Sequence, residues 1–110
     1  MPSQVTTHIL DTSLGRPAAG VAIELQSSDG AVLSSGTTNA DGRISDLLDD
    51  GETLEPGVYH MVFKTGPYYK ALGTRTFYPE VVIMFETFDT THYHVPLLLN
   101  PFGYSTYRGS

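Results

Sequence analysis

Glycine and proline interrupt this sequence at short intervals, and no stretch keeps the apolar period of a long helix. Between the interruptions lie short runs rich in β-branched and aromatic residues, at 5–10, 21–26, 31–38, 57–65, 80–88, 92–100 and 104–108. Short runs separated by turn residues are typical of a sandwich of two β-sheets. The pattern therefore predicts an all-β fold of about seven or eight strands in a single domain, residues 1–110.

Three connections and one helix can be predicted from their residues. "SSDG" predicts a hairpin between 21–26 and 31–38, "DTT" a hairpin between 80–88 and 92–100, and "NPFG" a turn into the last strand. "PYYKALG" breaks the strand pattern and predicts one or two helical turns. Gly73 would end this helix, because glycine adopts the left-handed conformation found at helix C-termini.

Charge and composition exclude several classes of partner. The net charge is −6, with only six Lys and Arg, which argues against nucleic acid or an anionic membrane as a partner. There is no cysteine, so the chain has no disulfide or thiolate chemistry. No apolar stretch could span a bilayer, and "MPSQVTTHILD" lacks a basic region followed by an apolar run. We therefore expect a cytoplasmic protein, although a processed mature form would have the same sequence.

Strand alternation assigns the histidines to an outward face. In "HYHVPLLLN", the uniformly apolar core face carries Tyr93, Val95, Leu97 and Leu99. His92, His94, Pro96 and Leu98 lie on the other face, and His8 shares the corresponding face of "VTTHILD" with Thr6 and Leu10. This outward face is too apolar to be left in water, so we expect it to contact another subunit. Because proline cannot donate to a strand ladder, we expect Pro96 at a bulge or a non-bonded position.

Each candidate site residue has an ordinary interpretation when it is taken alone. A single outward histidine is most often a surface polar residue, Arg43 is a common turn residue in "DGR", and "YRGS" would be a frayed end. His92 and His94 point the same way and could suggest a metal pair. However, the chain has no cysteine and no third ligand at a recognisable spacing, which argues against zinc.

Several segments together resemble one known family. They are "THILDTSLGRPAAGV", "TNADGRISDLL", "GVYHMVFKTGPYYKALG", "FYPEVVIMF", "HYHVPLLLNP" and "YSTYRGS". In order and over nearly the whole chain they resemble the transthyretin-related proteins, specifically the 5-hydroxyisourate hydrolases. The terminal "YRGS" is the most specific element, since hormone-carrying transthyretins lack it. The resemblance implies a transthyretin-like (prealbumin-like) sandwich of two four-stranded sheets with one short helix. It also implies a homotetramer with active sites at the dimer–dimer interface.

The resemblance also implies site residues. His8, Arg43 and His94 match the catalytic residues of the family, and Tyr107, Arg108, Gly109 and Ser110 match the segment that lines the substrate pocket. The implied reaction hydrolyses 5-hydroxyisourate, a product of urate oxidation, to 2-oxo-4-hydroxy-4-carboxy-5-ureidoimidazoline. It requires neither cofactor nor metal. Two departures are Asn100, where the family usually has serine, and Pro67 before the helix.

These residue types suit that chemistry. Histidine is the side chain best placed to act as a general base near neutral pH, and the fork of donors on arginine can stabilise negative charge on oxygen. In the tail, Tyr107 would form a wall, Arg108 a fixed cation, Gly109 a close backbone approach to the ligand, and Ser110 a hydroxyl and carboxylate. The alternatives are a non-catalytic small-molecule carrier and an adhesion or carbohydrate-binding sandwich.

Overall fold

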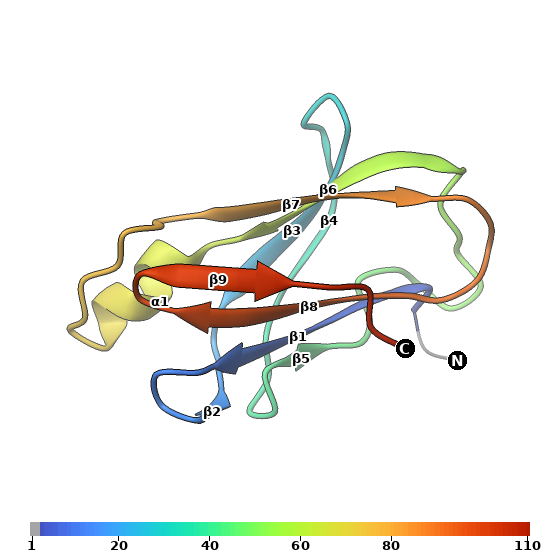
Figure 1. Cartoon of the computed structure of the whole chain (residues 1–110). Coiled ribbons are helices and arrows are strands. Elements are labelled where there is room, and N and C mark those ends of the chain that lie inside the picture. Colours follow the sequence, from blue (N-terminus) through green and yellow to red (C-terminus); the bar gives the residue numbers. More distant parts are fainter. Residues whose placement is uncertain (1–2) are drawn as a thin grey trace.

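The computed structural model describes residues 3–110, which form two facing β-sheets with a short helix at one end (Figure 1). Met1 and Pro2 belong to the predicted 1–110 domain but lie outside the described residues. The first sheet has the order β2-β1-β8-β9, with β5 also paired to β1, and the second has the order β4-β3-β6-β7. The strands of the first sheet are β1 Val5–Asp11, β2 Arg16–Pro17, β5 Arg43–Ile44, β8 Tyr93–Asn100 and β9 Gly103–Thr106. Those of the second are β3 Ala22–Ser27, β4 Val32–Thr37, β6 Gly57–Phe63 and β7 Val81–Thr87.

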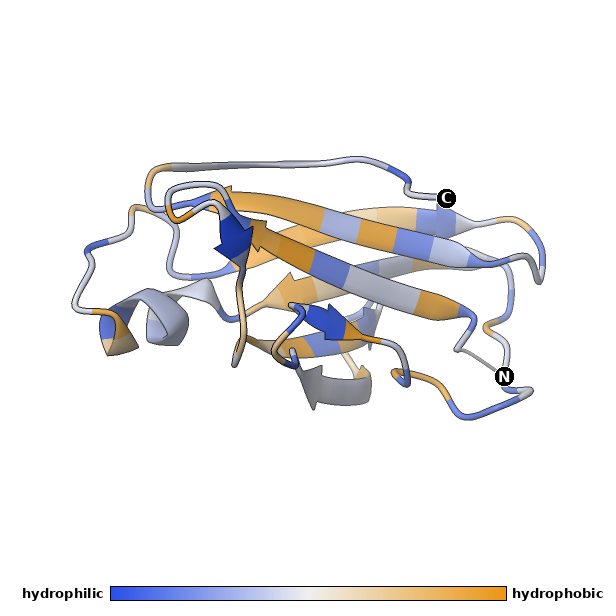
Figure 2. Cartoon of the chain, turned by 90° about the horizontal axis from the view of Figure 1, so that it is seen from below, coloured by the Kyte–Doolittle hydropathy of each residue, from blue (hydrophilic) through white to orange (hydrophobic). Residues whose placement is uncertain are grey.

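The core lies between the two sheets, and the alternation of the strands builds it. Apolar and polar residues alternate along the strands in Figure 2. Val5 and Ile9 of β1 and Leu97 and Leu99 of β8 are completely buried and meet Ile23, Leu25, Met61 and Phe63 of the facing sheet. The predicted core face of β8 is confirmed, since Tyr93 and Val95 are also buried. The all-β, transthyretin-like architecture is confirmed as well, with the two-residue β5 as a fifth member of one sheet.

The helix α1, Thr65–Ala71, covers one end of the sandwich. It begins two residues before the predicted segment, so Pro67 lies in the first turn, where a missing N–H removes no helical hydrogen bond. Tyr69 points into the core and is 1% exposed. Gly73 has a φ of 70° and ends the helix as predicted. No helix within residues 3–110 has the length and apolar character needed to cross a membrane.

The hairpin predicted across "DTT" is wrong. β7 pairs with β6, whereas β8 pairs with β1 and β9, so the connection crosses from one sheet to the other. The Tyr93 hydroxyl holds this crossing, because it accepts from the Phe88 amide (2.9 Å) and donates to Asp89 Oδ1 (2.9 Å). Turn residues indicate that the chain reverses, but not whether the flanking strands share hydrogen bonds. The hairpin predicted at "SSDG" is confirmed as the antiparallel β3–β4 pair.

Pro96 occupies a position that needs no backbone donor. Its carbonyl accepts from Thr106 Oγ1 (2.7 Å) and therefore faces the β9 side of β8. The β8–β9 pairing ends at Leu97 and Thr106, and pairing to the tail resumes only as a single bridge between His94 and Gly109. Pro96, which has no backbone N–H, thus lies where the pairing of β8 with β9 and the tail is interrupted, as predicted. The parallel β1–β8 pairing runs on without a shift from Val5–Tyr93 to Asp11–Leu99.

Candidate active site

The first sheet brings the three predicted catalytic residues together on its outward face. His8 of β1 is paired with Arg43 of β5 on one side and with Pro96 of β8 on the other. Two residues earlier on β1, Thr6 is paired with His94. Because paired residues on neighbouring strands share a face, these side chains form one continuous patch. Segments that are far apart in the sequence thus meet across three adjacent strands.

A hydroxyl group connects His94 of β8 with His92, which directly precedes this strand. Thr6 Oγ1 lies 2.8 Å from His94 Nδ1 and 2.9 Å from His92 Nε2. The two rings are stacked, with centroids 6.3 Å apart and planes inclined by 19°. His94 is half-buried and His92 is exposed. Since Nδ1 of His94 is engaged by Thr6, its Nε2 is the nitrogen left for other partners.

The C-terminal tail lies against His94. The Gly109 amide donates to the His94 carbonyl (2.9 Å), and a Cβ placed on Gly109 would lie 2.4 Å from Cδ2 of the His94 ring. The glycine therefore permits a close approach of the backbone to the His94 ring. The predicted tail residue thus contacts the predicted catalytic residue.

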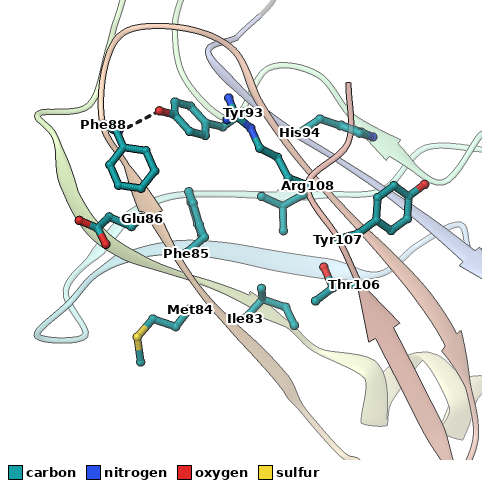
Figure 3. A pocket seen from close by; sticks show the side chains of 11 residues that line it. Ile83, Met84, Phe85, Glu86, Phe88, Tyr93, His94, Thr106, Tyr107 and Arg108 are labelled. Carbon is teal, nitrogen blue, oxygen red and sulfur yellow. Dashed lines mark hydrogen bonds between the residues drawn. The ribbon is translucent and has the colours of Figure 1, made fainter.

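Arg108 packs against Tyr93 and the backbone next to β8. Its guanidinium carbon lies 4.3 Å from the centroid of the Tyr93 ring, and Nη2 donates to the His92 carbonyl (3.2 Å). Figure 3 shows Arg108 directed toward Tyr93. Its positive charge also helps to lower the pKa of Asp89. In this chain Arg108 therefore fixes the tail to β8 and is not aimed at the histidine patch.

A cleft of about 270 Å³ opens between β7 and the tail (Figure 3). Its lining is mainly apolar, with Tyr107 and Arg108 on the tail side and His94 at one end. Neither His8 nor Arg43 belongs to this lining. The patch of His8, Arg43 and His94 is therefore an open sheet surface. The cleft reaches only the part of this patch that carries His94.

Both catalytic histidine candidates are biased toward the neutral form. Burial lowers the pKa of His94, and the charges of Arg43, His92 and His8 lower it further. Burial and then the Arg43 charge lower the pKa of His8, against a smaller opposing effect of Asp41. A neutral imidazole can accept a proton, so each ring can serve as a general base near neutral pH. Arg43 therefore acts on both histidines as well as offering its own donors.

Two residues at this site were not identified from the sequence as functional. Thr6 could have been identified from the sequence, because it lies two residues before His8 and therefore on the same outward face of the strand. Tyr93 was assigned to the core, and nothing in its own strand indicates that its ring also supports Arg108. In the part of the chain that the structure describes, no three His, Asp or Glu side chains form a group that could hold a metal ion.

Comparison with known proteins identifies the family. The model of the HIUase/Transthyretin family matches residues 5–109. A 5-hydroxyisourate hydrolase of Mesorhizobium japonicum is 46% identical over 114 residues, which cover 97% of this chain and 92% of the relative. The structure of Klebsiella pneumoniae 5-hydroxyisourate hydrolase matches with a TM-score of 0.87 and 40% identity, covering 96% of this chain and 98% of that one. Sea bream transthyretin in complex with thyroxine matches with a TM-score of 0.88 and 30% identity, covering 97% and 95%. The chain therefore belongs to the HIUase/Transthyretin family.

Proposed function

We propose that this protein is a 5-hydroxyisourate hydrolase of urate degradation. The observation that carries the proposal is the patch of His8, Arg43 and His94, in which the charge of Arg43 biases both histidines toward the neutral form. Relatives at 46% identity over nearly the full length bear this enzyme name. The overall fold does not decide between an enzyme and a carrier, because a hydrolase and a thyroxine-binding transthyretin match equally well.

The patch supplies the groups that hydrolysis of a cyclic acyl compound needs. One histidine removes a proton from water as the water oxygen attacks the acyl carbon. Arg43 stabilises the negative charge that develops on the carbonyl oxygen. The ring carbon–nitrogen bond then breaks, and a histidine delivers a proton to the leaving nitrogen. We assign His8 and His94 jointly to these two proton transfers, and every step uses side chains of this chain and water alone.

The tail residues have different roles in this proposal. Gly109 fixes the His94 ring by contact, and Arg108 fixes the tail through Tyr93 and the His92 carbonyl. Tyr107 and Ser110 are exposed and flank these anchors, so they are free to contact the substrate. We therefore assign all four tail residues to the substrate site. Arg108 contributes to this site by holding the tail in position.

We further propose a homotetramer in which a second dimer covers the histidine patch. Leu10 and Leu98 are only half-buried and lie on the same face as His8 and His94. An open sheet surface does not exclude water from a substrate, whereas a facing copy of the same patch would enclose it. A two-fold interface also brings like surfaces together, so each apolar outward face would meet its own counterpart.

The assay that tests the activity generates 5-hydroxyisourate in situ from urate and follows the decay of its absorbance with and without the protein. We expect faster decay with the wild-type chain and a loss of about 10²–10⁴-fold in the His94→Ala variant. A carrier would bind the compound without accelerating its decay. Wild-type protein that leaves the spontaneous decay rate unchanged would contradict the proposed function.

A further inference from the structure

Thr6 has one hydroxyl proton and two histidine partners. Oγ1 lies within hydrogen-bonding distance of His94 Nδ1 and of His92 Nε2 at the same time. The hydroxyl can donate to one ring and must accept from the other. The protonation states of the two rings are therefore linked, even though their centroids are 6.3 Å apart.

Two arrangements satisfy this constraint. In the first, His94 Nδ1–H donates to Thr6, and Thr6 donates to His92 Nε2, which leaves the lone pair of His94 Nε2 free to accept a proton. In the second, His92 Nε2–H donates to Thr6, and Thr6 donates to His94 Nδ1, so that His94 carries its proton on Nε2. Only the first makes His94 a base, and the second makes it a donor.

Building on the proposed hydrolase function, we propose that Thr6 and His92 form a proton relay behind His94. When His94 Nε2 accepts a proton from water, its Nδ1 proton passes to Thr6 Oγ1, and the Thr6 proton passes to His92 Nε2. His94 is then neutral again with its proton on Nε2, and His92 is an imidazolium ion. Reversal of the chain returns the same proton when His94 gives its Nε2 proton to the leaving nitrogen.

The charges around His94 favour this transfer. Arg43 on β5 and His8 on β1 both act on His94 electrostatically, and a proton kept on His94 would place a positive charge beside them. Just before β8 lies His92, whose charge also lowers the pKa of His94. From the tail Gly109 contacts the ring, and the Arg108 guanidinium lies over the Tyr93 ring with Nη2 donating to the His92 carbonyl. His92 is exposed, so an imidazolium ion there is hydrated.

The geometry of Thr6 suits a fixed relay rather than a chance contact. It is paired directly with His94 across the parallel β1–β8 ladder, so the backbone holds the two side chains side by side. A β-branched side chain in a strand also has restricted χ1 rotation. The contact of Gly109 on the His94 ring prevents that ring from turning away from Thr6.

The test compares four variants in the 5-hydroxyisourate assay. Thr6→Val removes the hydroxyl with little change of shape, Thr6→Ser keeps it, and His92→Ala removes the end of the relay. Thr12→Val is the matched control, because Thr12 Oγ1 donates only to the Leu99 carbonyl at the far end of the same strand pair. We expect Thr6→Val and His92→Ala to lower kcat about tenfold or more, less than the loss in His94→Ala. Thr6→Ser should restore most of the turnover lost in Thr6→Val, and Thr12→Val should stay near wild type.

A double variant and a pH profile separate a relay from simple support of the ring. In a relay, Thr6→Val combined with His92→Ala should be no worse than either alone, and both should change the pH dependence of kcat in the same way. Loss in Thr6→Val with wild-type turnover in His92→Ala would overturn the relay and leave Thr6 as a ring support. Additive losses would overturn it as well.

A second measurement does not depend on turnover. NMR of the imidazole nitrogens should show that the tautomers of His92 and His94 are linked in the wild-type chain and independent in Thr6→Val. Independent tautomers in the wild-type chain would overturn the relay even if hydrolysis is confirmed. If the wild-type chain does not hydrolyse 5-hydroxyisourate, the proposed function fails, and the NMR result still decides whether the hydrogen-bonded chain exists.

Discussion

Gly109 lies so close to the His94 ring that a side chain at this position would collide with it. A Cβ on Gly109 would lie 2.4 Å from Cδ2 and 3.1 Å from Cγ of the histidine ring, while the Gly109 amide donates to the His94 carbonyl. The last turn of the chain therefore determines where the ring of His94 lies. This contact joins the two most specific sequence motifs, "HYH" and "YRGS", in one structural unit.

Gly109→Ala should lower kcat/KM by about 100-fold, because a ring displaced by roughly 1 Å no longer meets substrate in a reactive geometry. The melting temperature should change little, since the tail buries few residues. Gly103→Ala is the matched control, as its Cβ would make only ordinary contacts at 3.7 Å with Asn100. Wild-type turnover in Gly109→Ala would show that the tail moves aside freely.

Deletion of residues 107–110 should nearly abolish hydrolysis and leave the sandwich folded. The deletion removes the Gly109 contact on His94 and the Arg108 anchor on Tyr93, whereas the core faces of β1 and β8 do not depend on the tail. Turnover and circular dichroism should be measured on the same preparation. A truncated chain with full activity would show that the tail is a frayed end, and a chain that no longer folds would show that its role is structural.

The acid limb of the kcat/KM profile should have its midpoint below 6.5, the ordinary histidine pKa. Burial and the Arg43 charge lower the pKa of both His8 and His94, so the active neutral form persists as the pH falls and is lost only below the usual range. Arg43→Gln should lower the rate and move the midpoint to higher pH. Arg75 lies on an exposed loop, so Arg75→Gln should change neither the rate nor the midpoint of the acid limb. An unmoved midpoint in Arg43→Gln would contradict the electrostatic role of Arg43.

Tyr68→Phe should cost more stability than Tyr69→Phe. The Tyr68 hydroxyl donates to the buried carboxylate of Asp11 (2.8 Å), whereas the buried Tyr69 hydroxyl makes no hydrogen bond of normal length among residues 3–110, although Asp11 and Ser13 lie near it. A hydrogen bond to a charged group contributes about 1.5–3 kcal/mol, and loss of an unpaired hydroxyl is close to neutral. Urea unfolding at neutral pH measures both variants. Equal losses would show that the Tyr69 hydroxyl is also bonded.

The stability contributed by the Tyr68–Asp11 hydrogen bond should depend on pH. Burial alone would raise the pKa of Asp11, but hydrogen bonds from Ser13, Tyr68 and Leu14 outweigh it and lower the pKa. A lowered carboxyl pKa contributes stability above its ordinary value of 3.8, and this contribution is lost as the pH falls through the folded value. The stability difference between Tyr68→Phe and Tyr69→Phe should therefore narrow in strong acid.

The wild-type chain should sediment as a tetramer at micromolar concentration. Leu98→Asp places a charge on the outward face that also carries His94 and should dissociate the tetramer without unfolding the chain, because Leu98 does not belong to the core cluster. Leu33→Asp, on the exposed edge strand β4, is the control and should remain tetrameric. A monomeric wild-type chain would contradict both the interface and the covered active site.

The sequence by itself determined the seven longer strands, their faces and the class of fold, but not the two-residue strands β2 and β5. Val5, Ile9, Leu97 and Leu99 alternate with polar or outward residues, and a strand must send alternate side chains to opposite sides, so His8 and His94 could be placed outside the core. The motifs around His8, Arg43 and the tail also indicated the family, whose model matches residues 5–109.

Only the tertiary structure decided which strands are neighbours. β8 lies parallel to β1 in one sheet and does not pair with β7, although a short turn connects the two. This pairing places Thr6 beside His94, and the returning tail places Gly109 on the same ring and Arg108 on Tyr93. The physical reason is that the alternation of side chains between two faces is a property of each strand alone. Pairing and register depend on how the apolar faces of all the strands are buried together.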